Sequence, residues 1–243
     1  LARRVGKMPN KQRLGYFPQY LERRAMKLKN LFICKNTEAS IEFIEGFKPD
    51  IVVNATGSVP LLPNIPGLKE NLEAGNVSTI FDLVDHVDSY PEDLSDKKVV
   101  VIGGGNVAID VARTSTRVGD YNVSMFCLED RKGMPASEEE VEEALEEGVK
   151  LDCGWGPKEI LTEDGHVTGI VLKRCISVKD ADGRFNPQYD ENDLKTINCR
   201  HVFLSIGQST IWGELLKGTK VQVDGVRVKA DKLTYQTTDP DIF

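Results

Sequence analysis

One group of glycines has the types and spacing for a recognisable chemistry. The apolar run Val99 to Ile102 is followed by Gly103-Gly104-Gly105-Asn106-Val107-Ala108, a G-x-G-x-x-A pattern. Gly103 permits a tight turn, Gly105 leaves no Cβ in the way of phosphates, and Ala108 is small enough for close helix packing. A helix starting at Asn106 directs its positive end and free N–H groups at an anion. The pattern predicts a pyrophosphate site, with a plain βα turn as the alternative.

The end of the next predicted strand, Val123 to Leu128, bears on which dinucleotide binds. It is followed by Glu129, Asp130, Arg131 and Lys132. A carboxylate there accepts hydrogen bonds from ribose hydroxyls and repels a 2′-phosphate, whereas arginines attract it. We predict that Glu129 contacts the ribose of NAD. Arg131 and Lys132 keep NADP open, and an exposed charge at a strand end is the alternative for Glu129.

Three further residues join the predicted cofactor-binding set. Asp110 lies on the helix after the glycine loop, where it faces the nicotinamide or pairs with Arg113 at the (i, i+3) spacing. Gly57 and Gly207 end two other predicted strands. Together with Gly103 to Ala108, Glu129, Asp130 and Arg131, they complete the candidate site. We predict no metal site, and we assign no catalytic residue.

The elements around the loop predict an α/β fold. Strand, glycine loop, helix and strand over residues 99–128 form a βαβ unit with a parallel sheet. Ser137 and Glu140 predict a capping box for a helix that Gly148 ends, and a strand follows at 149–153. Segments 160–162 and 167–178, around the turn Glu163 to Gly165, predict an antiparallel hairpin or meander. Residues 184–195 are expected to be a loop, 201–206 a strand and 221–228 a hairpin.

The first hundred residues are less regular. We expect a helix beginning near Pro18, a strand at 31–34, a short helix at 41–47 and a buried parallel strand at 51–53. Three prolines between Ser58 and Gly67 predict an extended crossover, and a helix is expected at 80–86. The polar stretch Tyr90 to Lys98 is the predicted domain boundary.

The overall composition excludes several classes of protein. The 243 residues carry a formal charge of −7 with no long basic run, which argues against nucleic acid as a partner. No apolar run reaches the roughly 18 residues of a membrane span, and we expect no secretory signal. The five cysteines show no C-x-x-C or zinc spacing, so we expect reduced core thiols in a cytoplasmic protein.

Other reactive residue types favour structural roles. His86, His166 and His201 have no partner spacing and are expected on the surface or in loops. Ser205 and Gly207 lack the preceding glycine of a nucleophile elbow, and Trp155 and Trp212 are expected to pack in the interior. The acidic stretch Glu138 to Glu147 is expected to be a solvated helix face.

Five stretches resemble the two-dinucleotide flavoprotein superfamily, in which an NAD(P) domain is inserted into a discontinuous FAD domain. They are KPDIVVNATGSVPLLPNIPG, VVVIGGGNVAIDVART, GMPASEEEVEEALEEGV, HVFLSIGQ and TTDPDIF. The resemblance covers nearly the whole chain. It implies a Rossmann-like three-layer NAD(P)-binding domain, with a parallel sheet and an antiparallel meander, inserted in a partial FAD-binding domain.

The resemblance also implies boundaries. Residues 1–57 would be a partial FAD-type segment, 58–95 a crossover, 96–207 the NAD(P)-binding domain and 208–243 a return segment. The implied function is hydride transfer from nicotinamide to FAD in a longer parent protein, whose remainder supplies the FAD domain.

Two subgroups compete within the superfamily. Pro9 to Gly67 looks most like the C-terminal region of old-yellow-enzyme-like reductases, the 2,4-dienoyl-CoA and 2-enoate reductase type, which would add an FMN barrel. The glycine-loop helix and the acidic helix look more like the glutamate synthase small subunit. That subgroup usually has two arginines where Leu128 and Glu129 stand. The family's proline after the last crossover is replaced by Thr210, so the path beyond Gly207 is expected to differ.

Two functions outside the flavoenzymes are alternatives. A non-enzymatic module that senses NAD(H) would not need the proline-rich crossover. A short-chain-type dehydrogenase would carry a Tyr-x-x-x-Lys pair after the nucleotide domain, and the sequence has none there.

The first FAD glycine loop of the superfamily and its terminal Gly-Asp motif do not occur in the sequence. We therefore predict that this polypeptide, purified alone, binds FAD weakly or not at all. Titration with FAD, followed by flavin fluorescence, tests this prediction. Tight, stoichiometric uptake would contradict it.

Overall fold

The computed structural model describes residues 2–89, 98–119, 122–210, 212–225 and 227–243. The chain folds into two compact units. Unit 1 comprises the residues up to Ala25 together with Leu62–Gly207, and unit 2 comprises Met26–Leu61 and Gln208–Phe243. The expected segment 1–57 is thus divided between the units at Ala25, and most of the expected crossover belongs to unit 1. The predicted boundary at 90–98 lies almost entirely outside the described residues.

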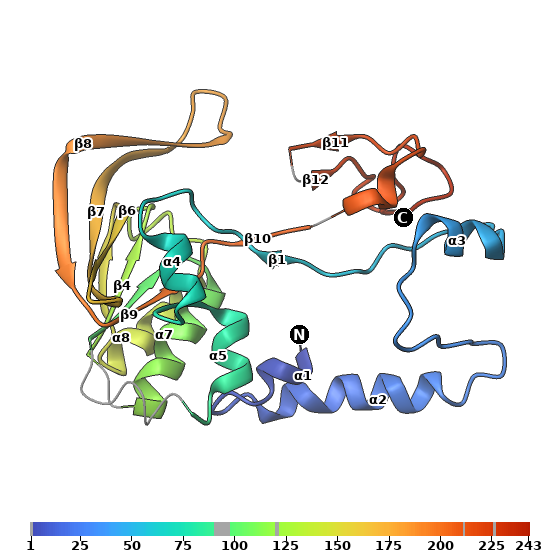
Figure 1. Cartoon of the computed structure of the whole chain (residues 1–243), viewed down its shortest axis with the longest axis horizontal. Coiled ribbons are helices and arrows are strands. Elements are labelled where there is room, and N and C mark those ends of the chain that lie inside the picture. Colours follow the sequence, from blue (N-terminus) through green and yellow to red (C-terminus); the bar gives the residue numbers. More distant parts are fainter. Residues whose placement is uncertain (1, 90–97, 120–121, 211, 226) are drawn as a thin grey trace. The chain divides into compact units, whose positions relative to one another are not determined.

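Unit 1 contains most of the regular structure (Figure 1). Its helices are α1 (Ala2–Val5), η1 (Gln12–Gly15), α2 (Tyr16–Ala25), α4 (Leu68–Glu73), α5 (Ile80–His86), α7 (Asn106–Gly119) and α8 (Glu138–Glu146). Its strands are β2 (Val77–Thr79), β3 (Lys98–Ile102), β4 (Asn122–Cys127), β5 (Lys150–Cys153), β6 (Trp155–Glu163), β7 (His166–Lys179), β8 (Phe185–Asn198) and β9 (His201–Leu204).

The centre of unit 1 is a parallel sheet with the order β2-β9-β3-β4-β5. Both of its faces are buried, because side chains alternate between two clusters along each central strand. On β3, Val99 and Val101 join one cluster and Val100 and Ile102 join the other. A continuous apolar strand is therefore required here, as the sequence of 99–102 predicted.

Helices and a second sheet cover the two faces. The first cluster contains Ile109 of α7 and Val141 of α8, and the second contains Trp155 of β6 and Leu172 of β7. Strands β6, β7 and β8 form an antiparallel sheet, whose long β7–β8 hairpin is visible in Figure 1. The predicted three-layer α/β class, with a parallel sheet and an antiparallel meander, is confirmed.

Strand β8 corrects the expectation of a loop at 184–195. Most of its side chains are exposed, so the sequence has no buried apolar positions to mark it. It is nonetheless a strand, because its backbone pairs with β7 from Phe185 to Asn198. Pairing on one edge satisfies the backbone without requiring an apolar face.

Two predictions about buried chemistry are also corrected. His201, expected in a loop or on the surface, is 3% exposed on β9 and lies 3.0 Å from the Ser78 hydroxyl through Nε2. Cys34, expected to be a core residue, is exposed. The strand expected at 31–34 is absent, and Phe32 within it is 87% exposed.

Residues 2–25 pack on the helical side of unit 1. Met8 is fully buried in the cluster that contains the α7 residues. Arg4 forms an ion pair with Asp85 of α5, and Lys11 forms one with Asp110 of α7. The segment is therefore part of the same core as the parallel sheet.

Arginines of α7 join that helix to α8. Arg113 pairs with Glu143 and, at 2.6 Å, with Glu147, and Arg117 also binds Glu147. Burial tends to raise the pKa of Glu147, but hydrogen bonds from the two guanidinium groups hold it below its usual value. Part of the acidic face of α8, expected to be merely solvated, is thus engaged with α7.

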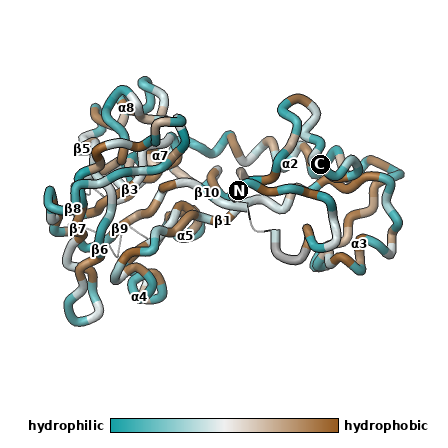
Figure 2. Tube along the Cα trace, turned by 90° about the horizontal axis from the view of Figure 1, so that it is seen from above, coloured by the Kyte–Doolittle hydropathy of each residue, from teal (hydrophilic) through white to brown (hydrophobic). Residues whose placement is uncertain are grey.

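Unit 2 contains short elements: α3 (Ile41–Phe47), β1 (Val59–Pro60), β10 (Gln208–Ser209), η2 (Gly213–Leu216), β11 (Val223–Asp224) and β12 (Arg227–Val228). Strand β1 pairs with β10, and β11 pairs with β12 as the predicted hairpin. Figure 2 shows hydrophobic and hydrophilic residues interspersed along α3, whose Phe47 is 66% exposed.

The buried strand predicted at 51–53 is not formed. Within the described residues this segment has a single parallel bridge, Val52 to Ile242, and Ile51 and Val53 are 57% and 71% exposed. The β-branched run lacks the neighbouring strands that would bury it. No described helix is long and apolar enough to cross a membrane.

We predict that Met8→Ala lowers the free energy of unfolding of unit 1 by about 2–5 kcal/mol, because it removes a fully buried side chain from the core. Chemical denaturation followed by circular dichroism measures the change. Met26→Ala is the matched control, because Met26 is 69% exposed and should change stability by less than about 0.5 kcal/mol. Equal effects would show that residues 2–25 do not share the core.

Candidate dinucleotide-binding site

The glycine loop lies at the carboxyl edge of the parallel sheet, between β4 and β9. The Gly103 N–H donates to the Phe126 carbonyl at 2.9 Å, and the Ser205 N–H donates to the Ile102 carbonyl at 2.8 Å. The loop therefore leaves β3 with its backbone held on both sides. In open parallel sheets ligands bind beyond this edge.

Gly103 is required by the packing of the protein itself. Its φ is +146°, and a Cβ at this position would overlap the carbonyl oxygen of Ser205 and lie 3.1 Å from the Ala108 Cβ. Ala108 is fully buried. These two small residues let α7 approach the ends of β3 and β9, as the G-x-G-x-x-A pattern predicted.

Gly105 differs from Gly103 in what surrounds it. A Cβ built on Gly105 would meet no heavy atom within 4 Å. Its carbonyl accepts from the Ala108 and Ile109 N–H groups, so it begins the 14-residue helix α7. No contact with the described residues excludes a side chain at position 105. A phosphate bound at the N-terminus of α7 would exclude one. This cradle fits the pyrophosphate of a dinucleotide.

The segment after β4 folds over the glycine loop. The Ala136 N–H donates to the Gly104 carbonyl at 3.0 Å, and the Ser137 N–H donates to Oδ1 of Asn106 at 2.9 Å. Ser137 also accepts the Glu140 N–H and begins α8, the first half of the predicted capping box. Local patterns in the sequence do not signal these two loop-to-loop bonds, because their partners are about 30 positions apart.

Glu129 lies against this loop. A Cβ at Gly104 would be 2.8 Å from Glu129 Oε2 and 3.0 Å from the Cys127 Cβ. The carboxylate thus lies beside the glycine loop, and its contact with a ribose stays a prediction. Asp130 instead accepts the Gly133 N–H at 2.7 Å, which closes a turn, and Arg131 donates to Glu138 at 2.9 Å.

Asp110 has a partner that the sequence did not indicate. Its carboxylate lies 2.6 Å from Lys11 Nζ, and both side chains are less than one-third exposed. The alternative pairing with Arg113 is wrong, because Arg113 binds Glu143 on α8 and Glu147 just after it. A half-buried carboxylate needs such a partner, so Lys11 accounts for its position without a ligand.

The remaining predicted site glycines lie in different parts of the chain. Gly207 ends unit 1 three residues after β9, with φ +115°. Gly57 is an exposed residue of unit 2, with φ +84°. Ser205 was not among the predicted site residues, yet its carbonyl contacts Gly103 and its hydroxyl is buried without a hydrogen-bond partner in the described structure.

Comparison with known proteins agrees with this geometry. The family described as pyridine nucleotide-disulphide oxidoreductase matches residues 24–243. The chain belongs to this family. The predicted resemblance to FAD- and NAD(P)-dependent flavoproteins is therefore confirmed, and the predicted cofactors are those of the family.

Two relatives show how much of a longer protein is matched. The chain is 33% identical over 189 residues to the glutamate synthase [NADPH] small chain of Azospirillum brasilense, covering 70% of this chain and 39% of that protein. It is 37% identical over 114 residues to the NADPH-Fe(3+) oxidoreductase subunit beta of Geobacter sulfurreducens, covering 46% of this chain and 17% of that one. The chain thus spans well under half of each relative.

Solved structures support the fold. Mycobacterium tuberculosis FprA in complex with NADPH matches with a TM-score of 0.65 and 18% identity, over 86% of this chain and 62% of that one. Thioredoxin reductase of T. acidophilum matches with a TM-score of 0.60 and 20% identity, over 79% and 55%. At these identities the likeness concerns the fold alone.

The described residues of unit 2 do not form the cradle that an FAD site of this family requires. The described part of unit 2 has no strand followed by a glycine loop and a helix. Its contact between 52 and 242 is a single bridge. Among the described residues, the arrangement of strand, glycine loop and helix is that of β3 and α7.

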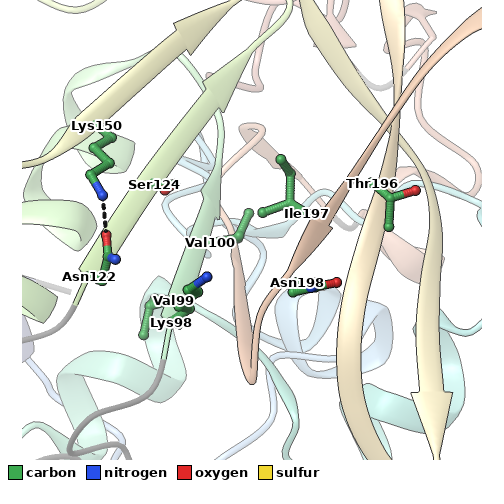
Figure 3. A pocket seen from close by; sticks show the side chains of 9 residues that line it. All are labelled: Lys98, Val99, Val100, Asn122, Ser124, Lys150, Thr196, Ile197 and Asn198. Carbon is green, nitrogen blue, oxygen red and sulfur yellow. Dashed lines mark hydrogen bonds between the residues drawn. The ribbon is translucent and has the colours of Figure 1, made fainter.

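A cavity of about 230 Å³ lies elsewhere in unit 1. Figure 3 shows Lys98, Asn122 and Lys150 around it, and these residues begin β3, β4 and β5. The cavity is therefore at the amino edge of the parallel sheet, and the glycine loop is at the carboxyl edge. The two features are separate, and the cavity is not part of the candidate site.

We predict that two glycine substitutions in one loop differ in the size of their effect on stability. Gly103→Ala should destabilise the protein by more than about 1 kcal/mol, because its Cβ overlaps the Ser205 carbonyl and its φ is positive. Gly105→Ala should change stability by less than about 1 kcal/mol, because the position is open. Urea unfolding of both variants measures this. A Gly105→Ala protein as unstable as Gly103→Ala would show that Gly105 has an internal packing role.

Proposed function

We propose that this chain binds a nicotinamide dinucleotide at the loop Gly103 to Ala108 and presents it for hydride transfer to the flavin of a longer flavoprotein. The observation that carries the proposal is Gly105, a glycine that no contact with the described residues requires. It lies at the N-terminus of α7, where free N–H groups and the helix dipole favour phosphate.

Each residue of the loop has a separate task in this proposal. Gly103 and Ala108 set the distance between α7 and the sheet. Gly104, Gly105 and the first residues of α7 would offer backbone N–H groups to the pyrophosphate. Bonds from Ala136 and Ser137 keep the loop in this shape before any nucleotide arrives. The nicotinamide dinucleotide supplies the hydride, and the protein orients it.

We further propose that NADH is preferred over NADPH. The Glu129 carboxylate stands beside Gly104, where it would accept hydrogen bonds from the ribose and repel a 2′-phosphate. The nearby Arg131 is held by Glu138, which lowers its availability for a phosphate. The two relatives described above carry NADPH in their names. The glutamate synthase subgroup usually has arginines where this chain has Leu128 and Glu129.

We also propose which longer protein supplies the flavin. The glutamate synthase small chain among the matched relatives favours that subgroup for the dinucleotide-binding part. An enoate-reductase-like parent with an FMN barrel is the alternative that residues 9–67 suggested. In either case the remainder of the flavoprotein is the expected partner, and the final electron acceptor would be bound there. Membership of an oxidoreductase family weighs against a purely sensing module.

Calorimetric titration of the chain with NADH and with NADPH tests these proposals. We expect tighter binding of NADH to the wild type, and Glu129→Arg should shift the ratio of the two dissociation constants towards NADPH by at least about tenfold, or 1.4 kcal/mol. Glu163→Arg is the control, because it makes the same charge change at an exposed position at the end of β6.

The outcomes separate the two parts of the proposal. A wild type that prefers NADPH would contradict the role of Glu129 and leave the loop assignment standing. Failure of both nucleotides to bind would contradict the loop assignment. Gly105→Ala should weaken both nucleotides while leaving the unfolding curve nearly unchanged, because its Cβ enters the phosphate position and meets no protein atom.

A further inference from the structure

Three sulfur atoms meet at the carboxyl edge of the parallel sheet. Cys127 is the last residue of β4 and Cys153 the last residue of β5, and the two are paired in register. Their Sγ atoms are 3.6 Å apart, and the Met134 Sδ lies 3.9 Å from the Cys153 Sγ. The sequence shows two cysteines 26 positions apart, and only strand pairing makes them neighbours.

The surroundings of these sulfurs do not favour a reactive or redox-sensing cysteine. Cys127 and Met134 are 1% and 8% exposed, and Cys153 is half-buried. Burial raises the pKa of the Cys127 thiol, and the neighbouring Cys153 raises it further. Burial also raises the pKa of the Cys153 thiol. A reactive or redox-sensing cysteine has the opposite property, a lowered pKa.

The ligand types select a narrow class of metal ion. The described residues contain no group of three or more His, Cys, Asp or Glu side chains that could hold a metal. A structural zinc site, with four such ligands, is therefore not built here. Two thiols and a thioether are soft ligands, a type that favours Cu(I) among the metals that remain.

We propose that Cys127, Cys153 and Met134 form a binding site for one monovalent soft metal ion of the Cu(I) class. Metal–thiolate bonds are about 2.3 Å long, so three sulfurs in a plane around one ion lie about 4 Å apart. The two measured separations, 3.6 and 3.9 Å, require only a small adjustment. Binding releases the two thiol protons and forms two metal–thiolate bonds, with no change in oxidation state.

The site borders Glu129 and the glycine loop, where a ribose is predicted to bind. The Cys127 Sγ lies 3.5 Å from the Glu129 carbonyl, and a Cβ on Gly104 would be 3.0 Å from the Cys127 Cβ. Two thiolates and one monovalent cation leave a net negative charge beside the dinucleotide loop. Metal binding should therefore weaken nucleotide binding, a consequence that rests on the proposed function, whereas metal binding itself does not.

Anaerobic titration with Cu(I), buffered by the chromophoric chelator bicinchoninate, tests the site. We expect the wild type to withdraw one Cu(I) ion per chain at this site. Cys153→Ser should abolish that binding, and Met134→Leu should weaken it at least about tenfold. Cys34→Ser and Cys175→Ser are matched controls that should retain it, because neither residue belongs to the sulfur group.

Several results would overturn the proposal. Unchanged Cu(I) affinity in Cys153→Ser would place the metal elsewhere. If the wild type does not withdraw Cu(I) from the chelator, the proposed binding site is excluded. A loss of two free thiols without metal would identify the pair as a disulfide instead. Cys153 is half-buried, so its serine variant should remain folded even where Cys127→Ser does not, and circular dichroism checks this.

The effect of copper on nucleotide binding is measured separately from copper binding itself. Titration of NADH into the copper-loaded and metal-free proteins should show at least about threefold weaker binding to the loaded form. If NADH binds neither form, the dinucleotide proposal fails while the chelator competition still decides the metal site. If Cu(I) binds and NADH affinity is unchanged, the metal site stands and its coupling to the nucleotide is contradicted.

Discussion

The contact between Gly103 and the Ser205 carbonyl constrains the whole carboxyl edge of the parallel sheet. It places the end of β9 where the side chain of residue 103 would be in any other amino acid. The backbone of Gly103 is bonded to β4 on its other side. The turn into α7 is thereby fixed, and Ala108 lets the helix lie close to the strands. A rigid turn of this kind offers N–H groups to an anion without reorganisation on binding.

The remaining elements of unit 1 depend on where that turn directs α7. The helix buries Ile109, Val111 and Ala112 against the sheet, and its polar side binds other elements. Lys11 reaches it through Asp110, and α8 reaches it through Arg113 and Arg117. These ion pairs are only partly buried, so each contributes little stability alone. Their effect is to orient the N-terminal segment and the acidic helix around one central helix.

The same edge of the sheet brings three kinds of chemistry together. Gly103 to Ala108 form the proposed phosphate cradle, the Glu129 carboxylate lies beside Gly104, and the Cys127 and Cys153 thiols lie close to each other at the same edge. All of them lie at or just after the carboxyl ends of β3, β4 and β5. Parallel strands end side by side, so residues far apart in sequence become neighbours there. For this reason, a change in charge at the sulfurs would affect a ribose bound beside Glu129.

Local sequence determined the glycine loop, the strand before it, the helices at 80–86, 106–119 and 138–146, and the hairpin near residue 224. These depend on periodicity, capping and turn residues, all of which act over a few positions. Strand β8 was missed because a polar edge strand has no periodic apolar face. The strand expected at 51–53 was wrong because burial depends on neighbouring strands as well as on β-branched residues. Tertiary structure alone decided the partner of Asp110, the position of Glu129 against Gly104 and the meeting of Cys127 with Cys153. Those contacts join distant segments, and chain pairing rather than local spacing sets the distances between them.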